Sequence, residues 1–266
     1  MQPGGSDIAV VVLTHNRRHL LEQCVANVLA RASARTGEIV VWDNASDDGT
    51  AEYLGSLEDP RIRIVRNERN IGQNAYDVAI RLTSAPYIVE VDDDVIDAPA
   101  GWDEALLDAF LRLPDVGFLA ANLAENPRDV TARIMYGENA HRYRIEERNG
   151  VRLKLGGPTG GGCALTSREL YDTVGGFGHR RRRAFWYEDA VYIAKLAKLG
   201  YEAAYLEDLR VLHAGGAEYA PVAPEKLEFW RARMRRARRR ARVKRALLRA
   251  PLVAPLNARY GWFEPP

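Results

Sequence analysis

The sequence predicts an α/β protein whose central sheet is mostly parallel and flanked by helices. Over the first 120 residues, short apolar runs alternate with stretches that have the hydrophobic spacing of a helix. Strands separated by helices indicate βαβ units, and these place ligands at the carboxyl ends of the strands. A chain of 266 residues, 47% hydrophobic and 28% charged, is typical of a globular protein with one large domain or two small ones.

The elements of the first half follow in order. Residues 8–13 form a continuous apolar run, as expected for a strand buried on both faces. Residues 20–29 then repeat apolar side chains on one face of a helix, which makes Cys24 a core residue. Further strands are expected at 38–42, 62–65 and 87–91, and further helices after Ser46 and over 72–82 and 102–111.

The second half is less regular. Residues 142–147 and 151–155 flank Asn149-Gly150, a dipeptide that favours a β-hairpin turn. A glycine-rich stretch, 156–162, precedes a short helix that Ser167 can cap. A last helix is expected over 188–199, ending at Gly200.

The formal net charge of +2 conceals an uneven distribution. Residues 226–249 carry twelve Lys or Arg and one acidic residue, a local +11 that leaves −9 for the rest of the chain. The apolar residues in this segment fall on one stripe, which predicts a basic amphipathic helix on an anionic membrane surface. Packing against the acidic body is a second interpretation, and nucleic-acid binding is the least favoured.

No apolar run approaches the roughly 18 to 20 residues of a membrane-spanning helix, and the first residues lack a signal pattern. The two cysteines, Cys24 and Cys163, form no disulfide framework or zinc motif. We therefore expect a cytoplasmic protein that the basic segment can hold at the inner face of the membrane.

Three adjacent carboxylates, Asp92, Asp93 and Asp94, directly follow the strand at 87–91. Their mutual repulsion needs an offset, and Mg²⁺ in proteins takes carboxylate oxygens together with substrate phosphates. A solvated acidic loop is the simpler alternative. The position directly after an apolar strand favours the metal.

Polar residues also follow the other predicted strands. Asp43 and Asn44 end the second strand, and Asp43 has the acceptors to bind a nucleobase or ribose. The remaining candidates for a nucleotide pocket are Thr14, Asn16, Arg17, Asn70, Gly72 and Asn74. Asp and Asn also favour turns and caps, which is the structural alternative.

Taken together, these segments resemble family 2 glycosyltransferases with the GT-A fold. The resemblance rests on VVLTHNR, VWDNASDDGT, RNIGQNA and VEVDDD, then GGGCALTSRELYDTVGGF, Trp186-Tyr187-Glu188-Asp189 and His213, and it spans residues 8–216. It implies a nucleotide-sugar half at about 8–121 and an acceptor half at about 122–216. A catalytic domain would then occupy 1–222, with the basic segment and tail at 223–266.

The resemblance implies an inverting single displacement that uses Mg²⁺ or Mn²⁺ and a UDP, GDP or dTDP sugar. Asp94, Asp92 and His213 would hold the metal, and Asp92 would also contact the ribose. Asp43 would accept hydrogen bonds from the nucleobase, and Asp93 would lie in the same nucleotide site without a defined role. The acceptor would be a glycan, a lipid-linked saccharide or a natural product.

For the acceptor side, the resemblance implies Asp189 as the general base, with Glu188 as second choice. Stabilising a helix N-terminus is the structural alternative for both carboxylates. Gly161 and Gly162 would lie at the acceptor or sugar. Trp186 would stack on a sugar or simply pack, and Arg183 would clamp a diphosphate or acceptor or belong to a solvated face.

Two other functions fit parts of the sequence. A sugar-phosphate nucleotidyltransferase also uses aspartates and a nucleotide-binding sheet. However, it needs a glycine-rich basic loop after the first strand, and LTHNRRHL contains no glycine. The other alternative is a non-catalytic module that binds a nucleotide sugar or nucleic acid.

Overall fold

The computed structural model describes residues 6–126, 132, 134–178, 188–215 and, further on, 235, 236, 239, 242 and 243. The side chains of Ile134, Glu138 and Glu188 lie outside this description. The chain divides into two compact units, Met1–Glu218 and Tyr219–Pro266. The elements named below belong to the first unit, and the expected domain boundary after residue 222 stays a prediction.

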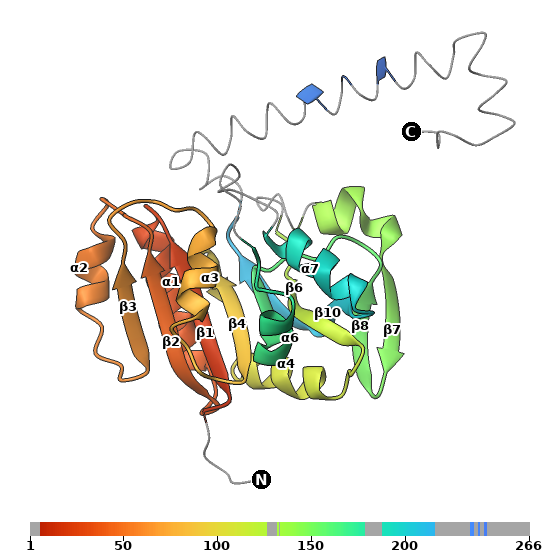
Figure 1. Cartoon of the computed structure of the whole chain (residues 1–266), viewed down its shortest axis with the longest axis horizontal. Coiled ribbons are helices and arrows are strands. Elements are labelled where there is room, and N and C mark those ends of the chain that lie inside the picture. Colours follow the sequence, from red (N-terminus) through yellow and green to blue (C-terminus); the bar gives the residue numbers. More distant parts are fainter. Residues whose placement is uncertain are drawn as a thin grey trace, which may run out of the picture. The chain divides into compact units, whose positions relative to one another are not determined.

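The described residues form one ten-stranded sheet, in the order β3-β2-β1-β4-β9-β6-β10-β8-β7, with β5 paired to β10 (Figure 1). The strands are β1 (Ile8–Thr14), β2 (Thr36–Asp43), β3 (Ile62–Arg66), β4 (Tyr87–Asp92), β5 (Val95–Asp97), β6 (Val116–Leu123), β7 (Arg144–Arg148), β8 (Val151–Leu155), β9 (Cys163–Ser167) and β10 (Glu202–His213).

The sheet is parallel on one side and mixed on the other. Strands β3, β2, β1 and β4 pair in parallel, and so do β6 and β10. Strand β9 lies antiparallel between β4 and β6, and β8 pairs antiparallel with β10 and β7. The prediction of a mostly parallel core sheet flanked by helices is confirmed.

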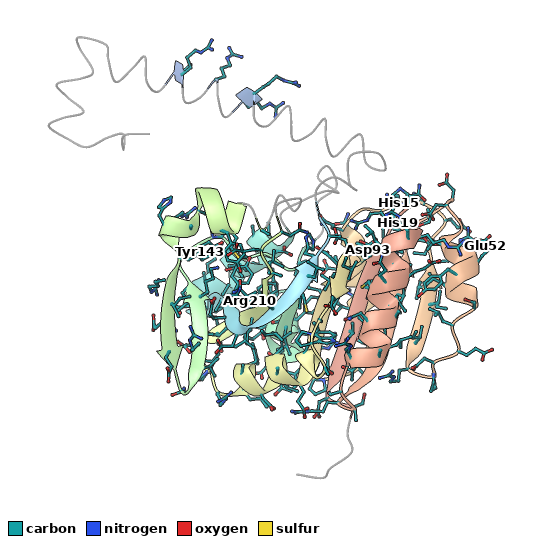
Figure 2. The ribbon with its side chains drawn as sticks, turned by 180° about the vertical axis from the view of Figure 1, so that it is seen from behind. His15, His19, Glu52, Asp93, Tyr143 and Arg210 are labelled. Carbon is teal, nitrogen blue, oxygen red and sulfur yellow. The ribbon has the colours of Figure 1, made fainter. Side chains whose placement is uncertain are left out.

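Helices cover both faces of this sheet. They are α1 (Arg18–Arg31), α2 (Thr50–Gly55), α3 (Asn74–Ile80), α4 (Trp102–Leu111), α6 (Arg168–Thr173) and α7 (Glu188–Lys198), with short turns η1 (Ile134–Glu138) and η2 (Ala140–Arg142). Helix α3 lies on the face seen in Figure 1, whereas α1 lies on the face seen in Figure 2. The apolar face predicted for residues 20–29 is buried, and Cys24 has no exposed surface.

The register of the central strands sets the position of the site. Leu13 of β1 pairs with Trp42 of β2 and with Asp92 of β4. The carboxyl ends of these three strands therefore lie at one edge of the sheet. Figure 2 shows His15 and Asp93 at that edge.

The structure also contains strands that the sequence pattern did not predict. Strand β6 is buried at all eight positions, so its sequence VGFLAANL lacks the alternation of a half-exposed strand. Strand β9 follows the glycine-rich stretch directly and is only five residues long. The expected hairpin does form, with Asn149 and Gly150 at positive φ of 49° and 71°, as its tight turn requires.

Candidate active site

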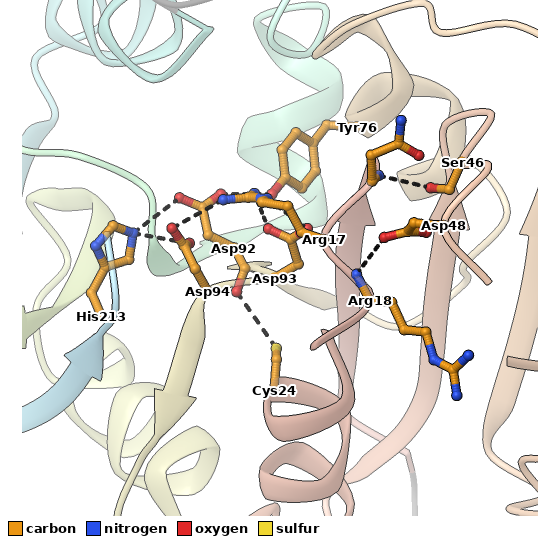
Figure 3. Close-up of polar contacts among 11 residues, drawn as sticks. Arg17, Arg18, Cys24, Ser46, Asp48, Tyr76, Asp92, Asp93, Asp94 and His213 are labelled. Atoms are coloured by element: carbon orange, nitrogen blue, oxygen red, sulfur yellow. Dashed lines mark hydrogen bonds and ion pairs between the residues drawn. The ribbon is translucent and has the colours of Figure 1, made fainter. Parts of the chain in front are cut away.

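The acidic triplet lies at the end of β4, and its three carboxylates differ in exposure. The side chain of Asp92 is 33% exposed, whereas those of Asp93 and Asp94 have no exposed surface. Buried carboxylates need charge partners or hydrogen bonds, because an isolated buried charge is strongly destabilising. Figure 3 shows where these partners come from.

Arg17, in the loop between β1 and α1, is the first partner. Its Nε lies 3.1 Å from Asp93 Oδ2, a second nitrogen contacts Asp93 Oδ1, and a third lies 3.1 Å from Asp94 Oδ2. Burial raises the pKa of Asp93 to about 7, opposed by the charge of Arg17 and reinforced by that of Asp94. Arg17 and Asp93 were both expected at a nucleotide. In the structure they bind each other, and their assignment to the nucleotide site stays a prediction.

His213, at the end of β10, is the second partner. Its Nε2 lies 3.0 Å from Asp94 Oδ1 and 3.8 Å from Asp92 Oδ2. The backbone fixes this approach, since the N–H of Ala214 donates to the carbonyl oxygen of Asp94 at 2.8 Å and His213 pairs with Val95 of β5. The structure thus brings together residues that are far apart in the sequence.

The ligand atoms of Asp92, Asp94 and His213 all lie within 4.8 Å of one another. The two carboxylates suit Mg²⁺ or Mn²⁺, an imidazole is a common ligand of transition metals, and a set of three leaves positions for phosphate oxygens. The triplet also carries more negative charge than Arg17 offsets. The donor set therefore fits a divalent cation.

Loops after β1 and β2 join beside this cluster. The backbone N–H of Asn16 donates to Ser46 Oγ at 3.0 Å, and Asn16 Oδ1 accepts from Asp47 N at 2.8 Å. Asn16 has a positive φ of 52°, a conformation that asparagine tolerates better than most residues. Thr14, at the tip of β1, is buried.

Asp43 lies buried at the tip of β2. One oxygen accepts from Ser46 N at 2.8 Å, and the other lies 3.6 Å from Nε of the largely exposed Arg66. No hydrogen-bond partner within the described residues reaches that second oxygen. A ligand that binds Asp43 through it would leave the bond to Ser46 in place.

Three further candidates form one hydrogen-bond network. Asn44 Nδ2 donates to Asn70 Oδ1 at 2.8 Å and to the carbonyl oxygen of Gly72 at 3.1 Å, and Asn70 Oδ1 also accepts from Gly72 N at 2.7 Å. This network fastens the loop before α3 to the tip of β2. Asn74 begins α3 and is half-buried.

Asp189, in the first turn of α7, meets the glycine-rich loop. The backbone N–H of Gly161 donates to Asp189 Oδ2 at 2.8 Å. Burial and the charge of Asp92 raise the pKa of Asp189 to about 6, although the bond from Gly161 opposes the shift. The carbonyl oxygen of the next residue, Gly162, accepts a hydrogen bond from Asp92 N at 2.9 Å, so the loop connects Asp189 with the cluster of Asp92, Asp94 and His213.

The remaining candidates lie outside the described residues. Trp186 and Arg183 belong to the segment 179–187, and the side chain of Glu188 is likewise not described. Their assignments stay predictions.

Two residues that the sequence pattern did not single out, Tyr76 and Ser46, contact Asp92 and Asp43. Tyr76, buried on α3, donates its hydroxyl to Asp92 Oδ1 at 3.0 Å (Figure 3). Ser46 holds both Asp43 and Asn16. The available signal for Tyr76 was its position in the first turn of a helix that begins near the strand ends. From there a tyrosine hydroxyl can reach the carboxylates that follow β4.

The fold and the arrangement of this site place the protein among GT-A glycosyltransferases. The family model for glycosyl transferase family 2 matches residues 9–175 of the chain. The chain therefore belongs to glycosyl transferase family 2, an enzyme family, as its resemblance predicted. Membership of this family favours glycosyl transfer over the two alternatives, a sugar-phosphate nucleotidyltransferase and a non-catalytic binding module.

Individual relatives agree with this assignment. The chain is 27% identical over 241 residues to an N-acetylglucosaminyl-diphospho-decaprenol L-rhamnosyltransferase of Mycobacterium tuberculosis, covering 77% of this chain and 75% of the relative. Its fold is similar to that of the mannosyltransferase PcManGT of Pyrobaculum calidifontis, solved with GDP-Man and Mn²⁺, with a TM-score of 0.54 and 23% identity. It is also similar to GalNAc-T7, solved with UDP, GalNAc and Mn²⁺, with a TM-score of 0.58 and 15% identity.

These alignments with solved structures cover 78% and 77% of this chain. They cover 56% and 42% of the two solved chains, so this protein spans about half the length of its structural neighbours. In the part of the chain that the structure describes, no helix combines the length and apolar character that crossing a membrane requires.

Proposed function

We propose that the protein transfers a sugar from a nucleoside-diphosphate sugar to an acceptor hydroxyl in a metal-dependent single displacement that inverts the anomeric configuration. One observation carries this proposal. The glycine loop 160–162 touches the cluster of Asp92, Asp94 and His213 on one side and Asp189 on the other. A donor diphosphate at the cluster would thus have a carboxylate within reach of its sugar.

The donor would bind at the carboxyl ends of β1, β2 and β4. Asp43 would accept hydrogen bonds from the base or ribose through its second oxygen, and the exposed part of Asp92 would face the ribose and the cation. Thr14 and Asn16 would shape the wall, and the network of Asn44, Asn70 and Gly72 would keep that wall rigid. Mn²⁺ in the two structural neighbours and their bound GDP-Man and UDP support a nucleotide donor and a metal.

Asp92, Asp94 and His213 would hold Mg²⁺ or Mn²⁺. When bound, the cation would stabilise the negative charge that develops on the leaving diphosphate. His213 would bind through Nε2, the nitrogen that faces both carboxylates. Arg17 would keep Asp94 in place from the other side.

Asp189 would act as the general base. The acceptor hydroxyl would give its proton to a carboxylate oxygen of Asp189 while its own oxygen forms the bond to the anomeric carbon. The bond from that carbon to the diphosphate breaks on the opposite face. A pKa near 6 suits this task, because the group is ionised at neutral pH and still accepts a proton readily.

The acceptor class that the relatives support is a saccharide or a lipid-linked saccharide. The name of the mycobacterial relative specifies a lipid-linked acceptor, N-acetylglucosaminyl-diphospho-decaprenol. Residues 226–249 would hold the enzyme at the inner face of a membrane that contains such a lipid, because each basic residue near an anionic surface contributes about 1 kcal/mol. All but five residues of this segment lie outside the described structure.

Sedimentation with vesicles tests the membrane proposal. Vesicles of phosphatidylcholine with and without phosphatidylserine should separate the anionic from the neutral surface, and a chain ending at residue 222 is the control. Binding that needs both the anionic lipid and residues 223–266 is expected. Equal recovery with neutral vesicles would contradict it.

A donor screen followed by two variants tests the chemistry. UDP, GDP, dTDP and CDP sugars with Mn²⁺ or Mg²⁺ are ranked by thermal shift, since a ligand that binds the folded state raises its stability by RT ln(1 + [L]/Kd). Release of nucleoside diphosphate from the best donor is then measured with saccharide and lipid-linked acceptors.

Asp94→Ala should abolish metal-dependent donor turnover and the metal-dependent shift. Asp189→Asn should keep the donor shift and lose roughly 10²- to 10⁴-fold in transfer, the usual contribution of a general base. Asp97→Ala, a nearby acidic residue that bonds Asn27 at the surface, is the control and should behave as wild type. Near-normal transfer by Asp189→Asn would reject Asp189 as the base.

A further inference from the structure

Strand β8 carries a buried cation that the proposed mechanism does not use. Lys154 is 8% exposed, and its side chain makes no ion pair or hydrogen bond within the described residues. Its Nζ lies 4.2 Å from the ring centre of Tyr136 and 5.1 Å from that of Tyr143. A ring face attracts a cation but does not replace a counter-ion. The nitrogen keeps some contact with solvent, unlike the enclosed indole nitrogens of Trp42 and Trp102, so an anion can reach it.

Two carboxylates act on the charge of Lys154 without forming an ion pair with it. Glu207 accepts from Asn122 Nδ2 at 2.9 Å with one oxygen, and its other oxygen lies 3.4 Å from a nitrogen of Arg210. Glu125 is exposed to solvent. Burial lowers the pKa of Lys154, the charges of Glu207 and Glu125 oppose this shift, and that of Arg210 adds to it. A bound anion would stabilise the ammonium group where these carboxylates do not.

The tyrosines around Lys154 form one cluster with a third ring. Tyr205 pairs with Lys154 across β10 and β8, so their side chains lie on the same face of the sheet. The ring centres of Tyr205 and Tyr143 are 6.3 Å apart, and the hydroxyl of Tyr143 donates to the carbonyl oxygen of Pro158 at 2.5 Å. Figure 2 shows Tyr143 on the side of the sheet that contains β7 and β8. Aromatic groups, and not charged ones, therefore surround this cation.

This cluster also contacts the glycine loop that meets the proposed base. Gly160 N donates to the hydroxyl of Tyr205 at 2.9 Å. The next residue, Gly161, donates its N–H to Asp189 Oδ2 at 2.8 Å. The glycine loop thus connects the surroundings of Lys154 with Asp189.

The width of the sheet separates Lys154 from the proposed position of the donor diphosphate. Strand β8 is four places from β4 in the sheet, and four steps of about 4.8 Å place Lys154 roughly 19 Å from β4 at the Cα atoms. The cation that would hold the donor diphosphate lies at Asp92 and Asp94, at the end of β4. An anion at Lys154 would therefore belong to the other substrate.

We propose that Lys154 binds a phosphate group of the acceptor. The ammonium group pairs with a phosphate at the reducing end of the acceptor sugar, while a hydroxyl of the same sugar lies at Asp189. A lipid-linked saccharide carries such a group where a diphosphate joins its sugar to its lipid. This inference rests on the proposed function, and it names the part of the acceptor that Lys154 recognises.

Calorimetric titration with inorganic pyrophosphate tests the anion site without an acceptor. EDTA in the buffer prevents the probe from binding through a divalent cation. Lys154→Met keeps the length of the side chain and removes its charge, so we expect it to bind pyrophosphate about 10- to 100-fold more weakly, the usual effect of a hydrogen bond to a charged group. Lys154→Arg keeps the charge and should retain most of the affinity. Lys198→Met changes an exposed lysine of α7 and should bind as wild type.

Transfer kinetics then assign the site to the acceptor. The acceptor saccharide found active with the best donor is compared as its 1-phosphate and as its methyl glycoside, both of which are soluble and need no membrane. Lys154→Met should raise KM for the 1-phosphate at least tenfold and leave KM for the methyl glycoside and the donor thermal shift unchanged. Thermal unfolding checks that each variant is folded.

The outcomes distinguish this inference from the function on which it rests. Equal pyrophosphate affinity of wild type and Lys154→Met would overturn the inference, and so would an equal rise of KM for both acceptors. A smaller donor thermal shift in Lys154→Met would also overturn it, because the anion at Lys154 would then be the donor diphosphate. Near-normal transfer by Asp189→Asn rejects the proposed base, whereas it leaves the dependence of pyrophosphate binding on Lys154 unchanged.

Discussion

Two buried carboxylate clusters meet at β4, and they offset their charge by different means. In the first, Arg17 reaches from the loop before α1 and binds Asp93 and Asp94. In the second, Asp189 reaches from α7 and accepts a hydrogen bond from Gly161 N, and the buried carboxyl group of Glu90 packs against the same glycine. A guanidinium stays charged at every relevant pH, so the first cluster depends on a fixed cation. In the second, burial raises the pKa of Asp189 to about 6, so its charge changes near neutral pH.

This difference matches what each cluster has to do. In the proposed mechanism the Arg17 cluster would present Asp94 to a cation and would need a constant geometry. Asp189 would accept a proton during each turnover, and a fixed positive charge beside it would weaken it as a base. Each of the following experiments alters one cluster or the contact between them.

The largest expected effect is the removal of the fixed cation. Arg17→Ala leaves two buried carboxylates without their charge partner, and breaking a buried pair in this way costs about 3–5 kcal/mol of folding stability. Urea unfolding should show a clearly lower midpoint. Arg18→Ala is the matched control, because the Arg18 pair with Glu22 is exposed and its loss should leave the midpoint unchanged. An Arg17→Ala midpoint equal to wild type would mean that the pair does not stabilise the fold.

The pH profile of transfer tests the Asp189 cluster. Asp189 must be ionised to act as base, and its pKa is raised to about 6 by burial and by Asp92. Lowering the pH through 6 should therefore reduce kcat/KM, to about a tenth of its plateau at pH 5, and raising it above 7 should have little effect. Saturating Mn²⁺ and a donor thermal shift at each pH serve as controls. A midpoint near 4 would show an ordinary exposed carboxyl group at work.

A smaller effect is expected at Asp92, which lies between the clusters. Tyr76→Phe removes the hydroxyl that donates to Asp92 Oδ1 and preserves the ring. Partners of metal ligands typically change affinity or activity by 10- to 100-fold, and with Asp94 and His213 intact we expect the lower end, about tenfold weaker Mn²⁺ binding. Calorimetric titration with Mn²⁺ measures this. Tyr53→Phe removes the hydroxyl of a half-buried tyrosine on α2 that donates to the Glu22 carbonyl oxygen, and this variant should bind Mn²⁺ normally.

The first half of the fold could be predicted because its strands and helices alternate with clear hydrophobic periods. The βαβ rule then placed residues 14–17, 43–44 and 92–94 at one edge without any knowledge of contacts. Strands β6 and β9 were not predicted, because β6 is buried throughout and β9 is short and antiparallel. Their neighbours in the sheet come from distant parts of the chain, which local patterns do not encode.

The site shows the same limit. The pattern VEVDDD indicated a cation site. Which of its three aspartates contacts Arg17 and which contacts His213 depends on the tertiary structure. Glu90 reads as an interruption in an apolar strand, and only the structure shows that its carboxyl group packs against Gly161. A polar residue inside a run of buried apolar ones was the available signal.

The position of the antiparallel strand β9 also affects how the chain folds during its synthesis. During synthesis Arg17 and the acidic triplet leave the ribosome early. Strand β4 pairs with β1 on one side and with β9 on the other, and His213 follows β9 in the chain. Until β9 has been made, one edge of β4 is unpaired, and unpaired strand edges promote aggregation. A nascent chain stopped before residue 163 should accordingly need chaperones, and the cluster of Asp92, Asp94 and His213 would be complete only after residue 213 has been translated.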